Sequence, residues 1–97
     1  MVKEHYKNKL IEIITKYLPD CAIYLYGSRA RKDHVAGSDI DLALDNKTTI
    51  NRLVIAQIQE DIDEKTTIPL MVDLIDVHAV DKAFLETIKK EWVPWKK

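Results

Sequence analysis

Two acidic residues interrupt an apolar stretch near the middle of the chain, and their spacing suits chemistry on phosphates. Asp39 and Asp41 stand two positions apart within the stretch SDIDLAL. Side chains at alternate positions of a strand point to the same face, so the two carboxylates should lie side by side. Such a pair is costly to bury unless a cation lies nearby. Because hard oxygen ligands suit Mg²⁺ or Mn²⁺, the pair predicts a divalent metal site.

A third acid, Asp73, lies in another apolar stretch, MVDLI, and could complete the metal site. This requires that its strand lies beside the strand that carries Asp41. Asp76 has the opposite parity and is interpreted as a solvent-facing or turn residue. Taken alone, an Asp-x-Asp pair could equally be the solvated face of a strand, because polar residues often alternate with buried ones.

A short turn before the acids has the composition of a phosphate-binding site. Gly27 lets a phosphate approach the backbone, and Ser28 offers a hydroxyl and free N–H groups at a helix N-terminus. Cationic side chains follow the turn and add further donors. The candidate nucleotide-binding residues are Gly27, Ser28, Arg29, Arg31, Lys32 and Ser38. Together with the acids, they indicate binding of a nucleoside triphosphate with its metal.

Helices are predicted where apolar residues recur every three or four positions. The expected helices, in chain order, are residues 3–18, a short helix from Ser28 to Lys32, one of about 14–16 residues after a cap at Thr48 or Thr49, and one that begins at Asp81. Ser28 and Asp81 are expected to be the N-caps of their helices. Asp61 and the acids around it are interpreted as a solvated helix face.

Strands are predicted where short apolar runs end at turn residues. The expected strands are residues 21–26, 39–44 and 70–77, with room for a fourth at Trp92-Val93. The order α-β-α-β-α-β-α predicts an α/β (α+β) fold, in which helices pack on a small mixed sheet of three to four strands. With no linker or repeat, the 97 residues are expected to form one domain, residues 1–97.

Composition limits the other classes of function. The chain is 46% hydrophobic and 32% charged, and its formal net charge of −1 gives no strong signal for direct nucleic-acid binding. The sequence has neither a signal peptide nor an apolar stretch that could span a membrane, which predicts a cytoplasmic protein without membrane contact. The single cysteine, Cys21, is expected in the core rather than in a catalytic or disulfide role.

The stretch GSRARKDHVAGSDIDL resembles a known family signature. Gly27-Ser28, ten further residues and then Asp39-Ile40-Asp41 are similar to the G-S-x10-D-x-D motif of the nucleotidyltransferase superfamily whose fold resembles that of DNA polymerase β. The stretch looks most like the minimal nucleotidyltransferases (MNT), which are encoded beside HEPN-domain partners in prokaryotic toxin–antitoxin pairs. The resemblance covers nearly the whole chain and implies a nucleotidyltransferase fold.

The resemblance also implies roles for individual residues. Gly27-Ser28 matches the phosphate-binding turn of the family, Arg31 its usual arginine, and Asp39 and Asp41 its metal ligands. Asp73 matches the third carboxylate, which in the superfamily helps to activate the attacking hydroxyl. The implied reaction is an in-line attack on the α-phosphate of a nucleoside triphosphate, with pyrophosphate as the leaving group.

Several residues depart from the family pattern or allow two interpretations. Lys32 stands where many relatives have glycine, and it could add a phosphate contact or crowd the turn. The tail from Glu91 to Trp95 lacks the glycine-containing ending common in relatives, which leaves nucleotide or partner contacts there open. Trp92 and Trp95 either cap the core or form an apolar patch that meets a partner. His34 either contacts a phosphate or the acceptor, or is a solvated loop residue.

The leading hypothesis is an MNT antitoxin that transfers AMP from ATP, with Mg²⁺ or Mn²⁺, to a hydroxyl of a cognate HEPN toxin in a hetero-oligomer. Tyrosine is the expected acceptor, and the toxin class comes from the family resemblance alone. One alternative is a non-catalytic antitoxin that neutralises its HEPN partner by binding. Another is a nucleotidyltransferase that acts on RNA or a small molecule, although 97 residues leave no second domain to hold such an acceptor.

Overall fold

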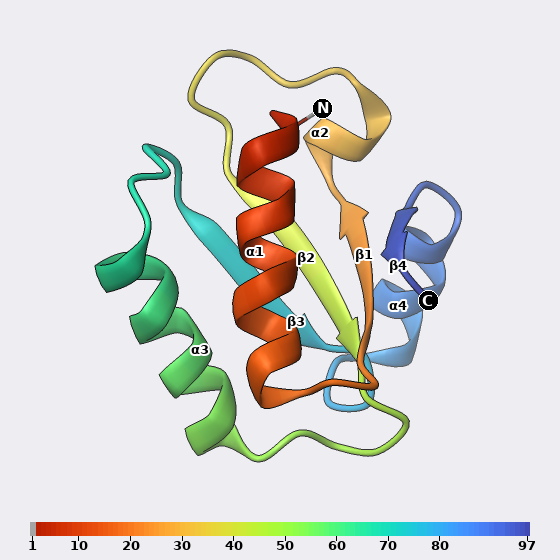
Figure 1. Ribbon diagram of the computed structural model, residues 1–97. Helices are drawn as coiled ribbons and strands as arrows, with labels where there is room; N and C mark the ends of the chain where they lie inside the picture. Colours follow the sequence, from red (N-terminus) through yellow and green to blue (C-terminus); the bar gives the residue numbers. More distant parts are fainter. Residues whose placement is uncertain (1) are drawn as a thin grey trace.

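The computed structural model describes residues 2–97 and shows helices packed on one sheet (Figure 1). Its elements, in chain order, are α1 (Glu4–Tyr17), β1 (Ala22–Tyr26), α2 (Ser28–Arg31), β2 (Ile40–Asp45), α3 (Arg52–Lys65), β3 (Val72–Asp76), α4 (Lys82–Lys89) and β4 (Val93–Lys96). The predicted order of elements is confirmed. The fourth strand, expected only at Trp92-Val93, extends instead from Val93 to Lys96.

The four strands form one mixed sheet in the order β3-β2-β1-β4. β1 runs antiparallel to both of its neighbours, whereas β2 and β3 run parallel. Parallel strands need a long crossover connection, and α3 lies in the one that joins β2 to β3. The mixed sheet therefore places the start of β2 and the start of β3 at the same end, close to the end of β1 (Figure 1).

Most of the core lies on the face of the sheet that α1 and α3 cover. Leu25 and Leu42 are fully buried there, and Leu10 and Ile58 pack against them from the two helices. Burial of such side chains removes apolar surface from water, which is the main source of stability for a domain of this size. Cys21 belongs to the same cluster, and burial raises the pKa of its thiol to about 11, which confirms its structural role.

A smaller cluster on the opposite face joins β1 and β2 to α4. Trp92 stacks on Tyr24 with ring centroids 3.9 Å apart and the planes 8° from parallel. Tyr26, Ala43 and Ile88 belong to the same cluster. Trp95 instead packs against the core beside α1. Both tryptophans therefore cap the core, which was one of the two interpretations of the tail.

Two predicted helix caps are wrong, and one is confirmed. α3 begins after Asn51, whose side chain accepts a hydrogen bond from the Leu53 N–H at 2.8 Å, so neither threonine before it is the cap. The N-cap of α2 is Gly27, and Ser28 is instead the first residue of that helix. Asp81 caps α4 as expected and accepts from two backbone N–H groups of the first turn.

Asp61, predicted on a solvated helix face, is buried instead. Asp76 is also buried, so the solvent-facing interpretation is wrong, but the turn interpretation holds because the Asp76 carbonyl oxygen accepts from the Ala79 N–H at 3.0 Å. Asp61 accepts a hydrogen bond from the Tyr17 hydroxyl and so links α3 to α1. Asp76 accepts from the backbone N–H of Ile50 at 2.7 Å and of His78 at 2.9 Å. Each carboxylate thus gains the partners that a buried charge requires. Among residues 2–97, no helix is long and apolar enough to cross a bilayer.

Candidate functional site

Strand pairing brings the predicted acids together at one end of the sheet. Asp41 pairs with Asp73 across the parallel strands β2 and β3, and with Tyr26 across the antiparallel strands β1 and β2. Paired residues of neighbouring strands point to the same face, so these three side chains form a row. Asp39 immediately precedes β2 and is exposed. The strand of Asp73 therefore does lie beside that of Asp41, as its proposed role requires.

Gly27 is required at the end of β1 by its contact with this row of acids. Its φ angle is +77°, and a Cβ atom at this position would lie 2.4 Å from the Asp41 Oδ2. Any side chain would therefore be strained and would displace the carboxylate. The sequence predicts glycine here for the approach of a phosphate, and the structure adds the packing of Asp41 as a second reason.

Asp41 carries charge that the protein does not fully compensate. Burial, and after it the charges of Asp73 and Asp39, raise the pKa of this half-buried carboxyl to about 6, while Arg31 opposes the shift. Burial, together with Asp41 and Asp73, also raises the pKa of the Tyr26 hydroxyl well above its usual value. The end of the sheet is therefore a region of negative potential that favours a bound cation.

The donor set fits a magnesium ion that arrives with its nucleotide. Among residues 2–97, no three His, Cys, Asp or Glu side chains converge closely enough to form a complete metal site. Mg²⁺, however, is usually held by one or two carboxylates together with substrate phosphates and water. Asp41 and Asp73 offer such carboxylates, and Asp39 lies next to them. The raised pKa of Asp41 reflects its burial first and then repulsion by Asp73 and Asp39, and a bound cation would offset both.

Two of the predicted nucleotide-binding residues make contacts within the loop. Arg29 is buried, and its Nε donates to the Ser38 carbonyl oxygen at 3.0 Å. The Ser38 hydroxyl oxygen accepts from the Val35 N–H at 3.1 Å. These contacts tie the turn after β1 to the residues just before β2. Both side chains therefore support the shape of the loop that carries Asp39.

Lys32 and Arg31 are the exposed cations of the turn. Lys32 ends α2 in the left-handed conformation, with φ 65° and ψ 23°. Glycine adopts this region freely, which accounts for glycine at the same position in the family pattern. Arg31 contacts Asp33 and also Glu91, a residue that lies 60 positions away in the sequence. Sequence reasoning did not single out Glu91 for a role, because no local pattern indicates this contact.

His34 is half-buried rather than solvated, contrary to one interpretation of the sequence. Its Nδ1 is buried and has no hydrogen-bond partner within residues 2–97. Burial lowers the pKa of the imidazole. A contact of this ring with a phosphate or the acceptor stays a prediction.

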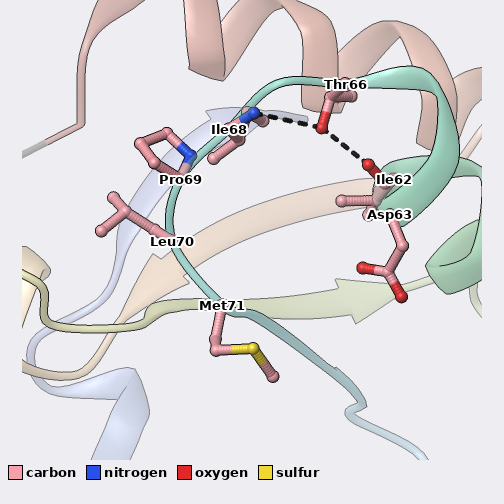
Figure 2. A pocket seen from close by; sticks show the side chains of 7 residues that line it. All are labelled: Ile62, Asp63, Thr66, Ile68, Pro69, Leu70 and Met71. Carbon is pink, nitrogen blue, oxygen red and sulfur yellow. Dashed lines mark hydrogen bonds between the residues drawn. The ribbon is translucent and has the colours of Figure 1, made fainter.

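A pocket of about 280 Å³ lies apart from the candidate site residues, none of which lines it (Figure 2). It is formed where the end of α3 leads into β3, and its lining residues are Ile62, Asp63, Thr66, Ile68, Pro69, Leu70 and Met71. Met71 connects the two regions, because it directly precedes β3 and its carbonyl oxygen accepts from the Ile40 N–H at 2.8 Å.

Comparison with known proteins agrees with this architecture. Residues 8–93 match the sequence family described as polymerase beta, nucleotidyltransferase. A curated relative from Haemophilus influenzae, named probable protein adenylyltransferase MntA, is 30% identical over 81 residues, which make up 84% of this chain and 70% of the relative. The match therefore includes the turn, the paired acids and the third acid.

Solved structures share the fold at lower identity. A chain of a toxin–antitoxin crystal structure with AMP-PNP has a TM-score of 0.77 and 21% identity, covering 92% of this chain and 71% of that chain. A chain of the Shewanella oneidensis complex between a tri-AMPylated HEPN toxin and its MNT antitoxin has a TM-score of 0.74 and 19% identity, covering 97% and 71%. At such identities the structures support the fold, and the functional argument depends on the site residues.

Proposed function

The chain belongs to the polymerase β-type nucleotidyltransferase family, and on this premise we propose that it is an MNT antitoxin that transfers AMP from ATP to a HEPN toxin. The observation that carries the proposal is the pairing of Asp41 with Asp73 beside the Gly27 turn. The names of similar proteins support the choice of reaction, since one is called a protein adenylyltransferase and another is bound to an AMPylated HEPN toxin.

The residues of this chain have separate tasks in the proposed reaction. The turn at Gly27-Ser28 and the guanidinium of Arg31 bind the phosphates and orient the α-phosphate toward the acids. Asp39 and Asp41 hold the magnesium ion, which when bound supplies a Lewis acid that stabilises charge on the attacking and leaving oxygens. Asp73 is exposed and lies in register with Asp41, so an incoming hydroxyl can reach it.

The proposed transfer is a single displacement at phosphorus. The acceptor hydroxyl, which we assign to a tyrosine of the toxin, attacks the α-phosphorus of ATP while Asp73 accepts its proton. A bond forms between the tyrosine oxygen and phosphorus, and the bond from the α-phosphorus to the bridging oxygen breaks. Pyrophosphate leaves with that oxygen. We propose that the acceptor surface belongs to the toxin and that the two proteins form a hetero-oligomer in the cytoplasm.

Transfer of label from ATP tests this proposal directly. The pure protein is incubated with ATP labelled at the α-phosphate, Mg²⁺ and the HEPN protein encoded beside it. We expect label on a toxin tyrosine. We expect Asp41→Asn to slow transfer by roughly 10²–10³-fold through lost stabilisation of transition-state charge, and Asp73→Asn by roughly 10²–10⁴-fold through loss of the proton acceptor. Asp20→Asn, an exposed acid in the turn between α1 and β1, is the matched control and should transfer normally.

Two outcomes would favour the alternatives. If the toxin is silenced in the complex while no label reaches it, the protein neutralises by binding alone. If label appears on RNA or on a small molecule rather than on the toxin, the acceptor class is wrong. A toxin labelled by the Asp41→Asn variant at the normal rate would contradict the assignment of the site.

A further inference from the structure

Arg31 is held from two sides, and one of its partners comes from the opposite end of the chain. Its Nε contacts the Asp33 Oδ2 at 3.0 Å, and its Nη1 contacts Glu91 Oε1 and Oε2 at 3.0 and 3.2 Å. The remaining nitrogen, Nη2, makes no hydrogen bond to any residue between 2 and 97. The guanidinium is therefore fixed in orientation while one of its edges stays available to an anion.

Glu91 reaches Arg31 because the end of α4 is itself anchored. The Glu91 and Trp92 backbone N–H groups both donate to the Ile88 carbonyl oxygen, at 3.1 and 2.9 Å. The next ring, Trp92, stacks on Tyr24, and Val93 pairs with Leu25 of β1. The glutamate is thus attached to the same strand that leads into the Gly27 turn, which sets its distance from Arg31.

The contact is better suited to orienting Arg31 than to stabilising the fold. The Arg31 side chain is 45% exposed, and ion pairs with such exposure contribute little to folding because solvent screens them. An arginine side chain has many rotamers, however, and holding it in place before a ligand binds lowers the entropic cost of binding. The position is relevant because α2 begins directly after Gly27, and the Arg31 backbone N–H donates to the Gly27 carbonyl oxygen at 3.1 Å.

We propose that Glu91 is a positioning residue for the nucleotide: together with Asp33 it holds the Arg31 guanidinium beside the Gly27 turn, with Nη2 directed to a phosphate oxygen of ATP. The proposal rests on the proposed function for the identity of the nucleotide. The proposal gives a role to the tail from Glu91 to Trp95. The sequence alone leaves the contacts of this tail open, because it departs from the family pattern. The glutamate itself touches no reacting atom.

ATP binding and turnover, measured on the full chain with Mg²⁺ and the partner toxin, separate a positioning role of Glu91 from a catalytic or a purely structural role. In Glu91→Gln we expect the KM and the Kd for ATP to rise about five- to tenfold, because Arg31 loses its charged anchor, while kcat changes less than about twofold. Asp33→Asn should have a smaller effect in the same direction. Glu86→Gln is the control, because it removes the same charge from a glutamate within α4. The ion pair of Glu86 with Lys89 is long, at 4.0 Å, so this variant should leave the KM and the Kd for ATP unchanged.

A double-mutant comparison shows whether the effect passes through Arg31. In an Arg31→Ala background, Glu91→Gln should change the KM no further, since the side chain that it positions is absent. Glu91→Asp, which keeps the charge, should restore part of the affinity. A fall in KM for Glu91→Gln would overturn the proposal, because Glu91 would then compete with the phosphates for Arg31. An undiminished rise in the Arg31→Ala background would also overturn it.

The two proposals fail in different ways. If the wild-type protein binds ATP but transfers nothing, the proposed transfer is wrong, whereas the Kd for ATP in Glu91→Gln still tests the role of Glu91. If transfer to the toxin is normal but the Kd does not respond to Glu91→Gln, the positioning role is wrong and the proposed function stands.

Discussion

The two faces of the sheet differ in composition, although the same strands form both: one is apolar and buried, and the other carries carboxylates. On the face covered by α1 and α3, Leu25 and Leu42 are fully buried among apolar neighbours. On the other face, Asp41 is half-buried and its pKa is raised to about 6, whereas Asp73 is exposed. The contrast occurs between adjacent residues of β2. A well-packed face of a sheet can therefore support an opposite face with mutually repelling carboxylates that suit cation binding.

α4 divides the second face into a covered part and an open part. The stack of Trp92 on Tyr24 closes the part next to Ala43, and Phe84 meets the Tyr26 ring edge-on at 6.1 Å. The acids lie just beyond this cover. The cover therefore ends before the acids, so the two faces can be perturbed separately by substitution.

The largest expected effect is on the packed face. Leu42→Ala removes a fully buried side chain beneath α1 and α3, and should lower the free energy of unfolding by about 2–5 kcal/mol. Urea denaturation measures the change. Leu53→Ala provides the control, because this leucine is 78% exposed, and it should change stability by less than about 0.5 kcal/mol. Equal costs for the two variants would contradict the placement of the core.

A smaller cost is expected where the open face meets the turn. Gly27→Ala should destabilise the protein by about 1–3 kcal/mol, because the backbone is strained and the new Cβ would overlap the Asp41 carboxylate. ATP binding should weaken in parallel, and calorimetry can measure both. Gly37→Ala has a similarly positive φ of +86° but open space around its Cβ, so it should cost less and leave ATP binding intact.

The sign of the effect should reverse at the acid itself. The pKa of Asp41 is higher in the folded protein than in the unfolded chain, so its contribution to stability is lost as the pH rises from about 4 through 6. Asp41→Asn should therefore raise the free energy of unfolding by about 1 kcal/mol at pH 7.5, after allowance for solvent screening of a half-buried group. The gain should vanish near pH 4, and Asp20→Asn should show no such dependence.

The smallest expected effect is at the end of α2. Lys32→Gly relieves the left-handed conformation, with φ 65°, but also increases the entropy of the unfolded chain. The net gain in stability should be roughly 0.5–1 kcal/mol by thermal or urea unfolding. Lys47→Gly, at φ 71°, should gain a similar amount far from the turn. If Lys32→Gly also weakens ATP binding and Lys47→Gly does not, Lys32 contributes a phosphate contact.

Local patterns were sufficient to predict the fold. Alternating apolar residues in β2 and the recurrence of isoleucines in α3 depend on neighbours in the sequence, and both elements form as expected. To predict that Asp41 and Asp73 lie close together required one further inference, namely that their strands are adjacent. The parallel pairing of β2 with β3 confirms that inference. These features could be predicted because each follows from a short-range period or from a single pairing of strands.

Several of the features that the sequence could not reveal depend on partners far along the chain. Asp61 is paired with Tyr17 across 44 positions, and Arg31 with Glu91 across 60. A charged residue is predicted at the surface unless its partner is known, and no local period identifies that partner. The misplaced cap of α3 has the same origin, since the distant Asp76 holds the Ile50 N–H and delays the start of the helix to Arg52.

The pairing of Asp41 with Asp73 makes the arrangement of the acids a check on correct folding. A slip of β3 by one residue against β2 would turn Asp73 toward the core and Leu74 toward water, because successive side chains of a strand face opposite ways. The same packing that selects the register therefore selects the geometry of the acids. A misregistered chain would lose the acid pair and the apolar contacts of β3 together, so folding errors in this sheet would not produce a stable protein with a damaged site.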